Sequence, residues 1–414
     1  MKDSKLNQPN PMDYAKVLFQ VGKFEEVEKV ANDVIQSDAE NYQALLLLGK
    51  ILLFKNKIEE SKTKLLKAKE VKPDEKELDV LLSEIYFRID DYQNASKHQE
   101  ALDRKDNTKR LLSFKDIIPF EVRNEKHNYR IKLLRVDPLP VIEVKINNQS
   151  SVNFLIDTGA AETVIDLDYA KELGLEIFGS DVGTFAGGKQ AVTYSGKVQS
   201  FTISDLTIHN MLVHLLPVRP VSQMFGGMQI DGIIGTVLFY HFITTLDYPN
   251  EEVIFRKKTD ENMKKYESNI EKLNPIIVPF WMVGDHFMVA WGSVNNSDPI
   301  LMFLDTGLAG GGFIGSKTTL DKASIELDES KAFIGLGGGG KVKAIPFVVD
   351  ELSFGDAQEK NIGGVYTANF PLENMLGFQI GGIISHQFFK PYALTFDFKN
   401  MRFILVRNNT KATP

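Results

Sequence analysis

Two hydrophobic periodicities divide the chain into two regions. Between about residues 11 and 105, apolar side chains recur at helical spacing, as at Leu48 and Leu52. From Asn107 onward, apolar and polar residues alternate, and β-branched residues, aromatic residues and glycines become frequent. The pattern therefore predicts a helical region, a linker over 110–115 and then an all-β region.

The helical region is repetitive. Turn-like triplets recur every 34 residues (56 − 22 and 90 − 56): Gly22-Lys23-Phe24, Asn56-Lys57-Ile58 and Asp90-Asp91-Tyr92. The repeat resembles the tetratricopeptide repeat, with Gly49 and Pro73 at the small-residue and proline positions of the middle unit. A plain helical bundle is the alternative. Because the region has no cluster of catalytic residue types, residues 11–105 are expected to bind a protein partner or to act as a scaffold.

The β region contains an internal duplication. An apolar run followed by Asp, Thr and Gly occurs twice, 148 residues apart (305 − 157). The two copies are Phe154-Leu155-Ile156-Asp157-Thr158-Gly159 and Met302-Phe303-Leu304-Asp305-Thr306-Gly307. A later apolar run returns 150 residues on (380 − 230), as Ile230-Asp231-Gly232-Ile233-Ile234-Gly235 and Ile380-Gly381-Gly382-Ile383-Ile384-Ser385. One Asp-Thr-Gly is a common turn, but turn formation alone does not explain two copies with matching flanks.

The duplication predicts two β lobes in one chain. We expect a helical domain over 1–106, a first lobe over 107–255, a partly helical linker over 256–275 and a second lobe over 276–408. Early strands of the first lobe are expected at 117–122, 129–135 and 141–146.

The two Asp residues suggest a shared chemical task. A carboxylate at the end of a buried strand is costly to desolvate, so it usually has a partner or a function. Two carboxyls about 3 Å apart cannot both ionise, and they share one proton. The ionised member can then activate a water molecule while the protonated member polarises a carbonyl group.

These motifs resemble the active-site loops of aspartic peptidases, and the first copy is closest to the retropepsin-like group. The resemblance covers roughly residues 117–407 and implies an all-β bilobal double barrel of acid-protease type behind the helical repeat. It implies that Asp157 and Asp305 form the catalytic pair. It further implies that the threonine hydroxyls bond across the lobes and that the glycines admit backbone N–H groups: Thr158, Gly159, Thr306 and Gly307.

Each lobe is also expected to contribute a glycine-bearing hairpin that folds over the substrate. The predicted flap residues are Ala186, Gly187 and Gly188 in the first lobe and Gly337, Gly338 and Gly339 in the second. Simple flexible hairpins without a role in binding are the alternative.

The loops also depart from the family pattern. Ala160 and Leu308 stand where pepsins usually carry a hydroxyl, so the carboxylates lose a donor and should titrate higher, with an optimum at weakly acidic to neutral pH. Ala161 replaces an acidic residue that retroviral enzymes use to hold the substrate backbone. Ser385 replaces a glycine, and the run 310–312 is all glycine, which raises the alternative of a degenerate second lobe.

Composition excludes several other functions. The net charge of −7 and a pI near 5.7 provide no basic field for nucleic acid. No apolar run approaches the ~18 residues that span a membrane. The chain has no cysteine and no His-Glu-x-x-His pattern, so we expect no metal and no cofactor. The N-terminus has no apolar signal region, which predicts a cytoplasmic protein, or a periplasmic or exported one if a leader has been removed.

We therefore interpret the sequence as a multidomain aspartic endopeptidase that hydrolyses a polypeptide substrate and carries a helical repeat for protein interaction. The first alternative is an inactive peptide-binding protein of the same fold. The second is a scaffold whose work lies in the repeats.

Overall fold

The structure is a computed structural model that describes residues 10–123, 126–185, 189–337, 340–368, 370 and 372–408. It forms two compact units. The helical unit comprises Met1–Leu111 together with Leu372–Gln379, and the β unit comprises Leu112–Pro371 together with Ile380–Pro414. Among the described residues, no helix combines the length and the apolar character needed to cross a membrane.

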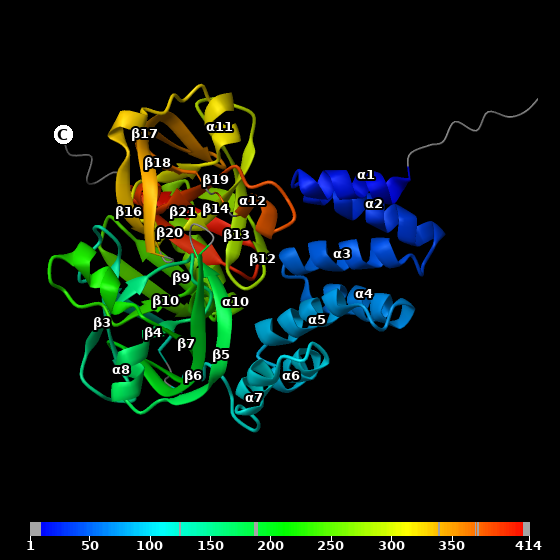
Figure 1. Ribbon diagram of the computed structural model, residues 1–414, viewed down its shortest axis with the longest axis horizontal. Helices are drawn as coiled ribbons and strands as arrows, with labels where there is room; N and C mark the ends of the chain where they lie inside the picture. The colour runs from blue at the N-terminus through cyan, green and yellow to red at the C-terminus, as the bar shows by residue number, and fades with distance from the viewer. Residues whose placement is uncertain are drawn as a thin grey trace, which may run out of the picture. The chain divides into compact units, whose positions relative to one another are not determined.

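The helical unit is built from helices that pack side by side in chain order (Figure 1). Their bounds are α1 Pro11–Gln20, α2 Phe24–Ser37, α3 Tyr42–Phe54, α4 Ile58–Val71, α5 Lys76–Arg88, α6 Tyr92–Ala101 and α7 Lys105–Leu112. Side-chain caps begin several of them; Asn41, for example, accepts a hydrogen bond from the Ala44 N–H at 3.1 Å.

The 34-residue repeat of the sequence reappears in the helix boundaries. The helices α2, α4 and α6 begin at Phe24, Ile58 and Tyr92, and each follows a turn residue with positive φ. These turn residues are Gly22 (φ +75°), Asn56 (φ +55°) and Asp90 (φ +60°), residue types that tolerate the left-handed region. Helical hairpins at this spacing agree with the predicted repeat, and its assignment to the tetratricopeptide class stays a prediction.

The structure differs from the predicted boundaries at two places. Helix α7 runs to Leu112, past the boundary expected at 106, because it buries Arg110 and Leu111. Residues 117–122 form no strand and contribute only an isolated bridge from Glu121 to His209. The positive φ values of Asp116 (+62°) and Phe120 (+50°) interrupt the extended conformation that the apolar run suggested.

The first half of the β unit contains a seven-stranded sheet in the order β2-β3-β8-β4-β7-β6-β5. Its strands are β2 Val141–Ile146, β3 Val152–Ile156, β4 Val164–Asp166, β5 Glu176–Phe185, β6 Lys189–Ile203, β7 Leu206–Leu216 and β8 Gly232–Ile234. Two short helices lie between these strands, α8 Leu167–Glu172 and the 3₁₀ helix η2 Arg219–Phe225, and α9 Thr236–Tyr240 follows β8.

The second half contains an eight-stranded sheet in the order β12-β13-β14-β19-β15-β18-β17-β16. Its strands are β12 Trp281–Val283, β13 Phe287–Val294, β14 Ile300–Asp305, β15 Phe313–Gly315, β16 Phe333–Gly337, β17 Gly340–Phe354, β18 Ala357–Thr367 and β19 Gly382–Ser385. Its helices are α11 Lys317–Lys322, η4 Glu329–Lys331 and α13 His386–Phe389, and α12 Leu372–Met375 belongs to the helical unit.

A third sheet joins the two halves. Its order is β1-β10-β9-β20-β21-β11, in which β9 Phe242–Asp247 of the first half pairs antiparallel with β20 Tyr392–Asp397 of the second. The remaining strands are β1 Asn128–Lys132, β10 Glu252–Lys257, β11 Ile276–Pro279 and β21 Arg402–Arg407. The predicted connection between the halves is partly helical, with α10 Asp260–Ile270 and η3 Glu271–Leu273.

The strand pairing repeats with the sequence. In the first half β3 runs parallel to β8, with Phe154 opposite Gly232, and in the second half β14 runs parallel to β19, with Met302 opposite Gly382. Each half thus supports its Asp-bearing strand with the later apolar run that the sequence also duplicates. The β unit is therefore an internally repeated β structure, and the finer double-barrel assignment stays a prediction.

Candidate active site

Asp157 and Asp305 lie together although 148 residues separate them in the sequence. Asp157 follows β3 and Asp305 ends β14, and in each half a parallel strand lies beside the acid: the Asp157 N–H donates to the Ile234 carbonyl at 3.0 Å, and Asp305 lies opposite Ser385. The two carboxyl groups lie close enough that each shifts the pKa of the other. The fold therefore brings the two acids together, and their role as a catalytic pair stays a prediction.

Two glycines make this approach possible. The Gly159 N–H donates to Asp157 Oδ1 at 2.7 Å, and the Gly307 N–H donates to Asp305 Oδ1 at 2.8 Å. A Cβ atom on Gly159 would lie 2.7 Å from Cγ of Asp305, and one on Gly307 would lie 2.1 Å from Cγ of Asp157. Any side chain at either position would therefore displace the opposite carboxyl group.

Two threonines form hydrogen bonds between the two Asp-Thr-Gly loops. The Thr158 N–H donates to Thr306 Oγ1 at 2.9 Å, and the Thr306 N–H donates to Thr158 Oγ1 at 3.0 Å. Each hydroxyl in turn donates to a carbonyl of the opposite strand, Thr158 to Leu304 at 3.1 Å and Thr306 to Ile156 at 3.3 Å. Both side chains are fully buried, so this reciprocal network holds the loops in one relative position.

The electrostatics of the pair favour a shared proton. Burial raises the pKa of Asp157, although hydrogen bonds from Asp305 and from the Gly159 N–H oppose the shift. Burial raises the pKa of Asp305 well above its ordinary value, and the charge of Asp157 raises it further. The pair titrates as one unit in which one carboxyl keeps a proton at a pH where an isolated Asp is ionised.

His286 is a neighbour of the pair that the sequence interpretation missed. Its Nδ1 lies 2.7 Å from Asp285 Oδ1, and its ring centroid lies 6.3 Å from that of Phe303, two residues before Asp305. The charge of a protonated His286 lowers the pKa of Asp157. Strands β13 and β14 pair Val289 with Phe303, so continuing the same register places residue 286 beside the Asp305 loop. The register is a property of the folded sheet, so no local sequence pattern indicates this neighbour.

The departure at Ser385 has a local structural explanation. Its first-half counterpart, Gly235, cannot bear a side chain, because a Cβ atom there would lie 2.3 Å from the Ala161 carbonyl oxygen. In the second half the Ser385 hydroxyl fits and donates to the Leu308 carbonyl at 2.8 Å. The Ser385 N–H also donates to the Gly312 carbonyl at 2.9 Å, so the glycine-rich loop after Asp305 is tied to β19.

The predicted flap tips fall largely outside the described residues. The hairpin β5–β6 is described up to the pair Phe185 and Lys189, so the predicted Ala186, Gly187 and Gly188 lie outside it. The hairpin β16–β17 is described up to Gly337, which pairs with Gly340, and Gly338 and Gly339 lie outside. Each half thus has a long hairpin at the predicted position, and its contact with a substrate stays a prediction.

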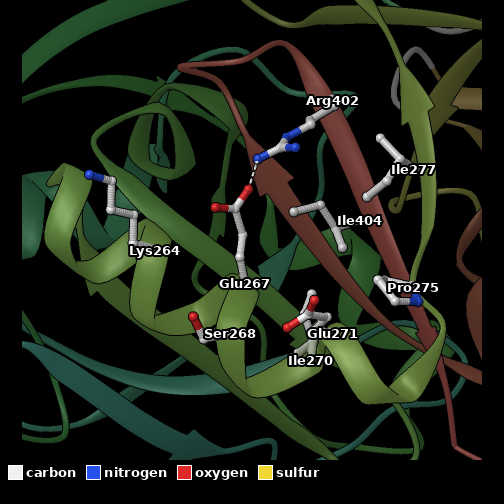
Figure 2. Close-up of a pocket in the computed structure, with 9 residues that line it drawn as sticks. All are labelled: Lys264, Glu267, Ser268, Ile270, Glu271, Pro275, Ile277, Arg402 and Ile404. Atoms are coloured by element: carbon white, nitrogen blue, oxygen red, sulfur yellow. Dashed lines mark hydrogen bonds and ion pairs between the residues drawn. The ribbon is translucent and has the colours of Figure 1, made fainter.

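A surface pocket lies elsewhere on the β unit. Its volume is about 500 Å³, and α10, β11 and β21 line it with residues that include Glu267, Ile277 and Arg402. Figure 2 shows Arg402 bonded to Glu267 across this pocket, and Arg402 also donates to Asp397 at 2.8 Å. The charge of Arg402 is thus paired within the protein. No group of three His, Asp or Glu side chains within the described ranges could hold a metal ion.

Comparison with known proteins supports the first of these sites. Residues 142–238 match the family described as "Aspartyl protease". The matched segment contains Asp157 and the parallel pair β3 and β8, and it ends before Asp305. No curated protein matches the chain. The resemblance of the first half to aspartyl proteases is therefore confirmed, while the second half is connected to it through the internal repeat.

Proposed function

We propose that this protein is an aspartic endopeptidase that uses Asp157 and Asp305 as one catalytic pair. The observation that carries the proposal is the close approach of the two acids: each carboxyl group accepts a hydrogen bond from the glycine N–H of its own loop and lies against the glycine of the opposite loop. The aspartyl protease match over 142–238 supplies the reaction class, and it makes a polypeptide the expected substrate.

The chemistry follows from the shared proton. The ionised carboxyl takes a proton from a water molecule, and the oxygen of that water attacks the carbonyl carbon of the peptide bond. The protonated carboxyl donates a hydrogen bond to the carbonyl oxygen and stabilises the developing charge. Collapse of the tetrahedral intermediate breaks the C–N bond, and the leaving nitrogen receives a proton from the pair. Because the pair titrates as one unit, neither role is assigned to one residue alone.

The surrounding residues support this chemistry by restricting motion. The Thr158–Thr306 network fixes the loops, so the carboxyls do not need to reorganise during the reaction. The raised pKa of the pair agrees with an optimum at weakly acidic to neutral pH, as expected from Ala160 and Leu308. The Ser385 substitution is accommodated by a hydrogen bond to Leu308, which argues against a degenerate second half.

The test compares cleavage of a quenched fluorescent peptide, with apolar residues flanking the cut, by the wild type and by Asp157→Asn and Asp305→Asn. Loss of either acid should lower kcat by on the order of 10³-fold or more, because general acid–base catalysis needs both members. A matched control is Asp168→Asn, an exposed acid of α8 that leaves both members of the pair in place. Binding of the peptide without cleavage by the wild type would identify an inactive peptide-binding protein instead.

A further inference from the structure

A segment of the second half is built into the helical unit. Residues Leu372–Gln379 lie between β18 and β19 in the sequence, yet they cluster with the helical unit rather than with the β unit. At the centre of the contact is Phe378, whose side chain is only 2% exposed. Its ring centroid lies 5.0 Å from that of Phe24, 5.8 Å from Phe19 and 6.4 Å from Phe54.

The backbone of the segment is fixed as well. The Gln379 N–H donates to the Gln20 carbonyl at the end of α1 at 2.8 Å. Gly377 adopts a left-handed conformation (φ +77°) that turns the chain just before Phe378. The geometry of the Phe378 contacts with Phe19 and Phe24 is edge-on, at 88° and 87°, which is the favourable arrangement for aromatic rings. The segment is thus docked by a side chain and by a main-chain hydrogen bond.

The first half uses the equivalent segment differently. The repeat offset of 150 residues (380 − 230) makes residues 222–229 the counterpart of 372–379. In that counterpart Phe225 is fully buried in a cluster with Val141 and Leu155, and the same cluster includes Ala309 from the second Asp loop. The first-half segment therefore packs within the β unit and borders the active-site loop of the other half.

The second-half segment leads directly to the site. Only Ile380 and Gly381 separate Gln379 from β19, and Ile380 is fully buried. Strand β19 pairs with β14 and ends with Ser385 opposite Asp305. A displacement of the docked segment would therefore act on the strand that supports the second catalytic loop.

We propose that docking of Phe378 in the aromatic pocket formed by Phe19, Phe24 and Phe54 positions the segment before β19 and thereby controls substrate affinity. This inference rests on the proposed peptidase function. Phe378 is then a positioning residue, and the helical unit is a regulatory part of the enzyme rather than an independent recruiting module. A partner that used the same aromatic pocket would have to displace Phe378 first.

The experiment compares full-length wild type with Phe378→Ala, with the conservative Phe378→Leu and with Tyr92→Ala as a matched control. Tyr92 is a 3% exposed aromatic side chain of the same unit that stacks on Phe87, away from the segment. Hydrogen exchange of the Gln379 amide reports docking, and the KM and kcat for the quenched peptide report the effect on the site.

In Phe378→Ala, exchange at Gln379 should accelerate at least about tenfold. The KM should rise about three- to tenfold with a smaller change in kcat, because the pair itself is untouched. Phe378→Leu should restore part of both effects, and Tyr92→Ala should leave both near wild type. Unchanged Gln379 exchange in Phe378→Ala would overturn the docking.

The remaining outcomes separate this inference from the proposed function. Faster exchange with an unchanged KM would overturn the control of substrate affinity, while the peptidase assignment would stand. An equal rise of KM in Tyr92→Ala would also overturn it, because a general loss of packing in the helical unit would then be enough to explain the rise. A wild type that cleaves no peptide would instead reject the peptidase function, and the exchange result would still decide whether the segment is docked.

Discussion

At the scale of single residues, the site depends on two positions that have no side chain. Gly159 and Gly307 leave room for the carboxyl group of the opposite half, which a Cβ atom would meet at 2.7 Å or less. This closeness creates the repulsion that forces the acids to share a proton. The close pair also lowers folding stability at neutral pH, because burial disfavours the ionised form of both carboxyl groups.

Asp305→Asn should therefore stabilise the protein at pH 7. The pKa of Asp305 is raised on folding, so between its ordinary value of 3.8 and the raised value the folded chain binds more protons than the unfolded chain. In that window stability falls as pH rises, and the loss is complete above the folded pKa. Each pKa unit corresponds to about 1.4 kcal/mol. Denaturant unfolding at pH 3 and pH 7 measures this; an equal change in stability at both pH values would contradict it.

His286→Gln should move the acidic limb of the pH–rate profile to higher pH. A protonated His286 favours the ionised form of Asp157, so its removal raises the pKa of Asp157. The expected result is a several-fold loss of kcat/KM in acid and little change near pH 7. The control is Asp285→Asn, which removes the neighbouring negative charge and should shift the limb the opposite way. A shift in the same direction for both variants would refute this electrostatic account.

At the scale of elements, the two halves support their Asp-Thr-Gly loops with similar strands that differ in individual residues. Gly235 follows β8 where the Ala161 carbonyl leaves no space for a side chain, whereas Ser385 ends β19 and bonds to Leu308. The duplicated strands therefore tolerate different residues at equivalent positions, 150 residues apart.

Placing the residue of one half at the equivalent position of the other should have unequal effects on the free energy of unfolding. Gly235→Ser should destabilise the protein by about 1–3 kcal/mol or more, because backbone oxygens surround the new Cβ atom. Ser385→Gly should cost about 1 kcal/mol through the lost hydrogen bond and should retain cleavage. Chemical denaturation together with the peptide assay tests this. Equal losses of stability in the two variants would show that the space for a side chain does not differ between positions 235 and 385.

Much of this organisation was predictable from local sequence, and its exceptions have physical causes. The 34-residue turns and the paired Asp motifs are local patterns, so they could be found without the structure. The strand expected at 117–122 failed because Phe120 adopts a positive φ that an apolar run does not reveal. Phe378 and His286 could not be assigned because their partners are distant in sequence, and the short segment around Phe378 has no periodicity.

At the scale of the whole β unit, the six-stranded sheet joins the two halves. At its centre β9 pairs with β20, and the hydroxyls of Thr245 and Thr395 lie 2.6 Å apart at a fully buried seam. Tyr266 of α10 also contacts Thr395, at 2.7 Å, so the connection between the halves takes part in the same network.

A double-mutant cycle should detect coupling across this seam. Thr245→Val, Thr395→Val and the double variant should show an interaction energy of about 0.5–1.5 kcal/mol, because each single change leaves a buried hydroxyl with fewer partners. Equilibrium unfolding measures this interaction energy. The control is Thr202→Val, which removes one member of a hydroxyl pair within the first half; the Oγ1 atoms of Thr202 and Thr207 lie 3.1 Å apart. Strictly additive effects would show that the seam hydroxyls do not act together.

The joining of both halves in one chain has a further consequence. In an enzyme assembled from two identical subunits, every substitution appears twice, and a change that helps one side must also be tolerated on the other. Here Ser385 stands in the second half where the first half has Gly235. The segment 372–379 packs in the helical unit, whereas its counterpart 222–229 packs within the β unit. A single covalent backbone thus allows the two copies to diverge, so that one segment packs within its own sheet and the other packs among the helices.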